Sequence, residues 1–86
     1  MFALFNLKIL TAERTIYTGD IFSLIAPAES GYLGVLANHA PLITTLVAGK
    51  IILKEIPDKQ VIIYSGGKGF LQVSKNEATL LLDSVS

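Results

Sequence analysis

The chain has 86 residues, which is enough for one small domain with a single hydrophobic core, and we expect residues 1–86 to form that one domain. Seven basic and seven acidic residues are scattered singly, so the charge pattern gives no reason to expect nucleic acid or an anionic membrane surface as a partner. Cysteine is absent, which excludes disulfides and thiolate metal sites, and the uncharged runs are far shorter than the roughly 20 residues of a membrane-spanning helix.

The N-terminal segment LFNLKIL alternates between apolar and polar side chains. Phe5, Leu7 and Ile9 project to one side while Asn6 and Lys8 project to the other, which is typical of a half-buried strand. Later segments are also short, rich in Ile, Val, Phe, Tyr and Thr, and bounded by Gly, Pro, Asp or Asn. These further predicted strands are residues 14–19, 20–27, 49–56, 60–66, 69–74 and 77–85.

Short turn sequences separate the later strands: PDK at 57–59, GGKG at 66–69 and KNE at 75–77. The glycines of GGKG predict a hairpin turn with positive φ, and we expect the strands from residue 49 onward to form a meander. Many short strands with no credible helix predict an all-β protein. Its strands form either two antiparallel sheets packed face to face or a flattened barrel.

In several strands the alternation fails, because apolar side chains project to both faces. This occurs at residues 51–53, 61–64, 69–71 and 80–82, in a chain whose apolar content is 51%. Edge packing and loops could cover these side chains. Taken over four strands, however, a contiguous apolar patch that docks a partner is the better interpretation.

The stretch GYLGVLANHAPLI, residues 31–43, contains the single histidine, His39. A catalytic base would need a nucleophile or an orienting carboxylate nearby, and the nearest acid along the chain is Glu29. A histidine in such a turn is more often a hydrogen-bonding strut or an interface residue, and no companions at metal-ligand spacing accompany it. We therefore interpret this stretch as a rigid, irregular crossover between two sheets, anchored by Leu33, Val35 and Leu36.

The sequence YSGGKG, residues 64–69, matches neither of the catalytic motifs that it suggests. A phosphate-binding loop requires glycine where this chain has Ile62, and a nucleophile elbow requires glycine at Ile63. Carboxylates such as Glu55 and Asp83 lie at turns or at solvent-facing positions rather than in pairs. We therefore predict no catalytic residue, no metal site and no cofactor. An enzyme or a ligand-binding β-sandwich module stays as the competing class, and either would need convergent polar groups in a pocket.

The segment SGYLGVLANHAPLITTLVAGKI strongly resembles the hallmark segment of the epsilon subunit of F-type ATP synthases. The matching residues are Gly31, Leu33, Gly34, Val35, Leu36, His39, Ala40, Pro41, Leu42, Thr44 and Gly49. The segments LKILTAERTIYTGD and SGGKGFLQVSKNEATLLLD also resemble that family, so the resemblance covers nearly the whole chain.

This resemblance implies a flattened antiparallel β-sandwich of about ten short strands in two sheets. It also implies a non-catalytic central-stalk rotor subunit that couples proton transport through the c-ring to ATP synthesis. Such a subunit is peripheral to the cytoplasmic face of a bacterial inner membrane. The positions that would contact the gamma subunit are Thr11, His39 and Thr44. Those that would contact the c-ring are Glu29, Ser30, Gly31 and Tyr32.

The sequence departs from the family pattern in two places. Tyr32 stands where relatives often have an acidic or polar residue. Most relatives also continue into a C-terminal helical hairpin that can inhibit ATP hydrolysis, whereas this sequence stops at Ser86, so we expect no intrinsic inhibition.

The surplus of apolar residues suggests how gamma would be held. The surface of an obligate interface is about as apolar as a hydrophobic core, so we expect one outer sheet face to dock on gamma. The candidate residues for that face are Ile52, Ile62, Tyr64, Phe70 and Leu81, of which Ile62, Tyr64 and Phe70 are the predicted contacts.

Overall fold

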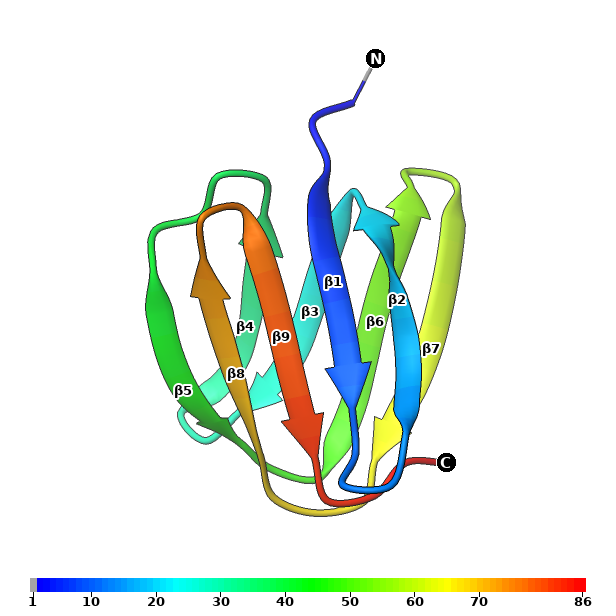
Figure 1. Ribbon diagram of the computed structural model, residues 1–86, viewed down its shortest axis with the longest axis vertical. Coiled ribbons are helices and arrows are strands. Elements are labelled where there is room, and N and C mark those ends of the chain that lie inside the picture. Colours follow the sequence, from blue (N-terminus) through cyan, green and yellow to red (C-terminus); the bar gives the residue numbers. More distant parts are fainter. Residues whose placement is uncertain (1) are drawn as a thin grey trace.

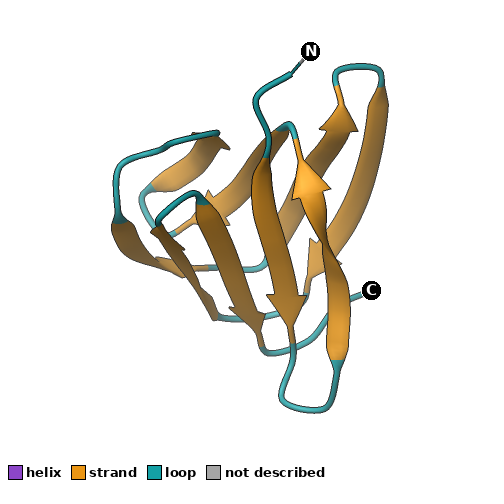
Figure 2. Cartoon of the chain, turned by 45° about the horizontal axis from the view of Figure 1, so that its top comes forward, coloured by secondary structure: helices purple, strands orange, loops and turns teal. Residues whose placement is uncertain are grey.

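The computed structural model describes residues 2–86, which form nine β-strands joined by turns (Figures 1 and 2). The strands are β1 (Phe5–Leu10), β2 (Thr15–Ile21), β3 (Ser23–Ala28), β4 (Gly31–Leu36), β5 (Leu42–Leu46), β6 (Gly49–Ile56), β7 (Lys59–Ser65), β8 (Gly69–Ser74) and β9 (Glu77–Leu82). The predicted all-β class is confirmed. Within this described range, no helix is present that could cross a membrane.

All nine strands belong to one curled sheet, in the order β2-β1-β9-β8-β5-β3-β6-β7, with β4 paired to β3. In Figure 1 the strands β5, β8, β9, β1 and β2 form the front half of this sheet, and β4, β3, β6 and β7 form the back half. The two halves are joined where Ala28 of β3 pairs with Leu46 of β5. The expectation of antiparallel strands in two sheets is thus confirmed only in part. One continuous sheet is present, and β1 runs parallel to β9.

The core lies between the two halves of the curled sheet. Alternating residues of each strand point into it, as the LFNLKIL pattern predicts, and Phe5, Leu7 and Ile9 are all buried. Buried side chains of both halves form a single hydrophobic cluster, which also contains Leu24, Leu46, Ile51, Leu53, Leu71 and Leu80. Close packing of this cluster makes the two halves one stiff body.

The predicted meander after residue 49 is wrong. The hairpins β6–β7 and β8–β9 form as expected, but β8 pairs with β5, so the chain crosses from the back half to the front half between β7 and β8. The glycines of this crossing do not adopt the positive φ expected of a hairpin turn. At Gly69 the reason for glycine is close approach, since a Cβ there would lie 2.6 Å from the Leu81 carbonyl oxygen.

The irregular crossover expected at residues 31–43 is confirmed only at residues 37–41, which lead to β5, because residues 31–36 form the regular strand β4. It pairs with β3 along its whole length, from Gly31 opposite Ala28 to Leu36 opposite Ser23. Of the three predicted anchors, Val35 is buried and Leu33 packs against the core, whereas Leu36 is 58% exposed.

A polar contact joins the front and back halves on the side away from β5. The Tyr17 hydroxyl on β2 donates to Glu55 Oε2 on β6 at 2.8 Å, and Glu55 Oε1 lies 3.1 Å from Lys59 Nζ. Burial raises the pKa of Tyr17 to about 12, and the hydrogen bond to Glu55 adds to this rise. The Tyr17 hydroxyl, followed by Lys59, lowers the pKa of Glu55.

Candidate functional site

The outer surface of the front half has a row of residues that crosses four strands and is apolar except for Thr45. Thr45 of β5 lies opposite Phe70 of β8, Phe70 lies opposite Leu81 of β9, and Leu81 lies beside Leu10 of β1. We call these residues the front row. Phe70 is 55% exposed and Leu81 is 47% exposed, although both are large apolar side chains. Because residues directly opposite each other in a sheet share one face, their side chains form a continuous strip.

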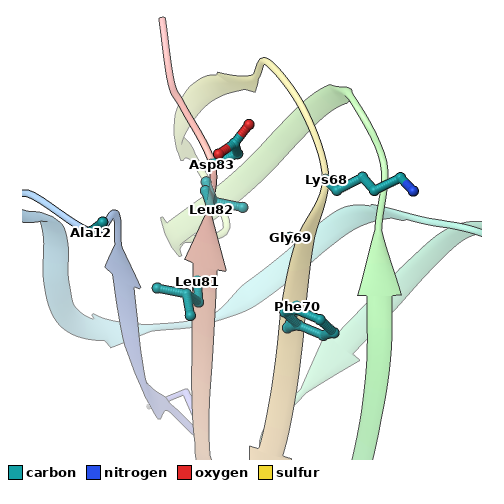
Figure 3. Close-up of a pocket in the computed structure, with 7 residues that line it drawn as sticks. All are labelled: Ala12, Lys68, Gly69, Phe70, Leu81, Leu82 and Asp83. Carbon is teal, nitrogen blue, oxygen red and sulfur yellow. The ribbon is translucent and has the colours of Figure 1, made fainter.

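A depression of about 460 Å³ lies along this strip (Figure 3). Figure 3 shows Phe70 on β8 and Leu81 on the neighbouring strand β9, with Lys68 and Asp83 at one end of the depression. Ala12, Gly69 and Leu82 complete the lining. The depression therefore has an apolar wall and a charged end of each sign, which suits a protein side chain better than a reacting substrate.

The back half has a second apolar row. Ile25 of β3 lies opposite Ile52 of β6, which lies opposite Ile62 of β7, and we call these three residues the back row. On the next strand, Gly34 lies opposite Ile25, and the space around its Cα is open. A groove of about 310 Å³ forms there, lined by Ser23, Leu24, Ile25, Gly34, Val35, Leu36, Ile52 and Lys54.

The five candidates, some of which were predicted to form one docking face, are therefore split between two faces. Ile52, Ile62 and Tyr64 lie on the back half, whereas Phe70 and Leu81 lie on the front half. A single docking face can include only some of them, because the connection from β7 to β8 crosses between the halves. Exposed apolar residues that the prediction omitted include Ile25, Leu36 and Ile43.

The residues predicted to contact a c-ring lie together in the β3–β4 turn and at the start of β4. The Glu29 carboxylate accepts a hydrogen bond from Thr45 Oγ1 at 2.7 Å, and the Glu29 N–H donates to the Thr45 carbonyl at 3.1 Å. Ser30 is exposed, and Gly31 has φ +130°, a conformation that favours glycine. Tyr32 is 63% exposed, and its hydroxyl accepts from the Lys50 N–H at 3.4 Å. This turn is polar and braced against β5.

His39 lies in the connection between β4 and β5. Its main-chain N–H donates to the Leu36 carbonyl at 3.2 Å, and its ring Nδ1 lies 2.7 Å from the Ala40 carbonyl oxygen. Because a carbonyl only accepts, this contact requires a proton on Nδ1. The side chain is half-buried. A backbone carbonyl as partner fits the strut interpretation better than a catalytic base, which needs a nucleophile or a carboxylate.

The other two residues assigned to gamma by resemblance are separated from His39. Thr11 lies in the β1–β2 turn, where its N–H donates to the Arg14 carbonyl at 2.9 Å. Thr44 is half-buried on β5, opposite Leu71 of β8. The β1–β2 turn and the β4–β5 connection lie at opposite ends of the molecule, but both border the front half (Figure 1).

Residues 2–86 contain no cluster of three or more His, Cys, Asp or Glu side chains that could hold a metal ion. What the surface does offer is two apolar rows and a braced polar turn. Such features suit contact with other proteins.

Known proteins match this chain over nearly its whole length. The family model for the ATP synthase delta/epsilon chain β-sandwich domain matches residues 4–86. The ATP synthase epsilon chain of Dichelobacter nodosus is 34% identical over 82 residues, which are 95% of this chain and 57% of that relative. The epsilon chain of Chlorobaculum tepidum is 39% identical over 82 residues, covering 95% of this chain and 92% of the relative.

The fold has close counterparts among solved structures. A chain in the structure of the Euglena gracilis mitochondrial ATP synthase, with OSCP, F1 and c-ring, matches with a TM-score of 0.90 at 17% identity. The match covers 98% of this chain and 53% of that one. A chain in the central stalk and c-ring structure of the Tetrahymena thermophila mitochondrial ATP synthase gives a TM-score of 0.78 at 11% identity. That match covers 94% of this chain and 64% of the other.

These matches define the class first: the described strands form the β-sandwich domain found in ATP synthase delta and epsilon chains. The chain belongs to the epsilon chain family of ATP synthases, and the resemblance noted in its sequence is confirmed. It spans 57% of the length of the Dichelobacter relative but 92% of the Chlorobaculum relative.

Proposed function

We propose that this chain is a non-catalytic rotor subunit that binds gamma, rests on the c-ring, and couples proton-driven rotation to ATP synthesis. The match to the epsilon family over residues 4–86 carries this proposal. In this role the β-sandwich domain acts without a cofactor. It is peripheral to the membrane, on the cytoplasmic face of a bacterial inner membrane, and attaches through the complex rather than by insertion.

The front half is the proposed surface for gamma. Its apolar row runs between the β1–β2 turn, which contains Thr11, and β5, which contains Thr44 and follows His39. Docking on this half would place Phe70 between the turns that contain Thr11 and His39. Thr44 lies opposite the buried Leu71, so its side chain is on the inner face of the sheet and not on the face of Phe70. Ile62 and Tyr64 belong to the back half and fall outside this proposed contact.

The β3–β4 turn is the proposed surface for the c-ring. Its carboxylate, hydroxyls and backbone suit a small polar contact. Thr45 links this turn to the front row, because its side chain holds Glu29 at 2.7 Å while its strand position lies opposite Phe70. A force applied at the turn thus reaches the gamma surface through one strand and one hydrogen-bonded pair. This short path suits the transmission of torque without slip.

We propose in addition that this domain by itself does not inhibit ATP hydrolysis. The inhibitory element of related chains is implied to be a helical hairpin, and residues 2–86 contain only strands and turns. The hydrolysis rate of an F1 complex assembled with this chain should match that of the same complex without it.

Reconstitution tests the proposal as a whole. Membranes with an ATP synthase that lacks its epsilon subunit would be supplied with this chain, and ATP-driven proton pumping would be measured together with capture of isolated gamma. We expect gamma to be captured and pumping to be restored. The rotor function is wrong if the folded chain neither binds gamma nor restores pumping, and turnover by the isolated chain would favour an enzyme instead.

A further inference from the structure

The β8–β9 turn holds an asparagine that joins three distant parts of the chain. Asn76 Oδ1 accepts a hydrogen bond from the Asn38 N–H at 2.7 Å, and Asn76 Nδ2 donates to the Leu4 carbonyl at 2.9 Å. The main-chain carbonyl of Asn76 also accepts from the Asn6 N–H at 3.2 Å. In Figure 1 the N-terminal segment, the β4–β5 connection and the β8–β9 turn all lie at the same end of the molecule.

The backbone of this turn makes the choice of asparagine informative. Lys75 and Asn76 have φ values of +52° and +59°, as a two-residue hairpin turn of the mirror-image type requires. Glycine is the residue that most readily fills the second position of such a turn. Asparagine tolerates that conformation and adds an amide with one acceptor and two donors. Here the amide both accepts and donates a hydrogen bond, whereas a glycine has no side chain to do either.

The partner of Asn76 Oδ1 lies in the turn that presents His39. Asn38 has φ +63°, and the His39 N–H closes this turn on the Leu36 carbonyl. The Asn38 N–H points out of the turn and would otherwise have only water as its acceptor. Holding this N–H fixes the turn relative to β8 and β9, and hence relative to Phe70 and Leu81 of the front row.

We propose that Asn76 is a positioning residue for the turn at Asn38 and His39, and that it holds this turn in register with the front row for contact with gamma. The second part rests on the function proposed above. The hydrogen bond to Leu4 anchors the N-terminal segment to the same point, so loss of the amide frees two segments at once.

Two substitutions separate these effects. Asn76→Gly keeps the positive φ but removes both side-chain hydrogen bonds. Asn76→Asp keeps an acceptor for the Asn38 N–H but cannot donate to the Leu4 carbonyl. Lys75→Gly is the matched control, because it changes the neighbouring residue of the same turn and leaves the amide of Asn76 in place.

Amide hydrogen exchange by NMR tests the positioning, and gamma affinity tests its purpose. In Asn76→Gly we expect the Asn38 amide to exchange roughly tenfold faster and gamma to bind roughly tenfold more weakly, which corresponds to the loss of about one hydrogen bond. In Asn76→Asp we expect the exchange rate of the Asn38 amide and the affinity for gamma to return toward their wild-type values. The Asn38 amide shift should then follow the ionisation of the introduced carboxylate.

Three results overturn the proposal. These are unchanged exchange of the Asn38 amide in Asn76→Gly, faster exchange with unchanged gamma affinity, and the same changes in Lys75→Gly. If wild type fails to bind gamma, the rotor function fails, and the exchange measurements still decide whether Asn76 positions the turn.

Discussion

The front and back halves of the sheet have apolar rows of similar character in different surroundings. The front row lies between the β1–β2 turn and β5, and Thr45 connects it to the polar turn at Glu29. The back row is flanked by lysines on β6, since Lys50 lies opposite Tyr64 and Lys54 opposite Gln60. The difference teaches that exposed apolar area alone does not identify a docking surface. The segments that border a row decide which partner it can reach.

The sharpest way to break this comparison is to place a charge in each row. We expect Phe70→Asp to weaken gamma binding by about 100-fold, because a desolvated carboxylate replaces an aromatic anchor. Ile62→Asp on the back row should leave the affinity within about threefold of wild type, the range of a contact outside the interface. Titration calorimetry with isolated gamma measures both, and circular dichroism verifies folding. Equal losses in the two variants would contradict the assignment of gamma to the front half.

A second comparison uses one glycine from each half. Gly69→Ala should lower the free energy of unfolding by about 1–3 kcal/mol, since the new Cβ would lie 2.6 Å from the Leu81 carbonyl oxygen and β8 would have to move. Gly34→Ala should change it by less than about 0.5 kcal/mol, because the new Cβ meets open space. Urea unfolding measures both values. Similar losses would show that the close approach at Gly69 does not restrict the residue there.

The contact between the two halves gives a pH-dependent prediction. The raised pKa of Tyr17 means that its neutral phenol stabilises the fold below the ordinary pKa of 10.0, and this contribution is lost as the pH rises toward about 12. Tyr17→Phe should lower the melting temperature by a few degrees at pH 8. Above pH 10.0 the stability of wild type should fall more steeply than that of the variant. If the stability of wild type and that of Tyr17→Phe change in parallel with pH over this range, the hydroxyl of Tyr17 does not stabilise the fold.

The smallest effect is expected at the polar turn. Glu29→Ala removes the carboxylate that Thr45 holds, and we expect ATP-driven proton pumping to fall by about twofold, as for an exposed polar contact. Asp58→Ala, in the β6–β7 turn of the back half, is the matched control. Pumping that is unchanged in both Glu29→Ala and Tyr32→Ala would remove this turn as the c-ring contact.

Local features of the fold could be predicted from the sequence. Alternation in LFNLKIL correctly gave the inward and outward sides of β1, and turn residues correctly gave the β6–β7 and β8–β9 hairpins. The break expected after Gly19 was misplaced, however, because β2 continues to Ile21. Gly19 pairs there with Leu7, within the regular register that runs from Phe5 opposite Ile21 to Ile9 opposite Tyr17.

Non-local features could not be predicted, because alternation describes one strand and not its neighbours. Ile62 and Phe70 look alike in the sequence, each outward-facing in an apolar strand, and only the crossing between β7 and β8 puts them on different halves. Glycine was likewise ambiguous. A turn conformation and a close backbone approach both favour it, and at Gly69 only the distance to the Leu81 carbonyl distinguishes them. The hydrogen bonds of Asn76 to residues 38 and 72 positions away leave no local pattern.

The parallel pairing of β1 with β9 has a consequence for how the protein is made. Asn6 to Leu10 align with Glu77 to Leu81, so the first of the described strands pairs on one side with the last of them. Closing that loop requires nearly all of residues 2–86, and non-local pairing of this kind slows folding. The front surface therefore cannot exist on any nascent fragment that lacks β9. Assembly with a partner through that surface must wait until translation of this strand is complete.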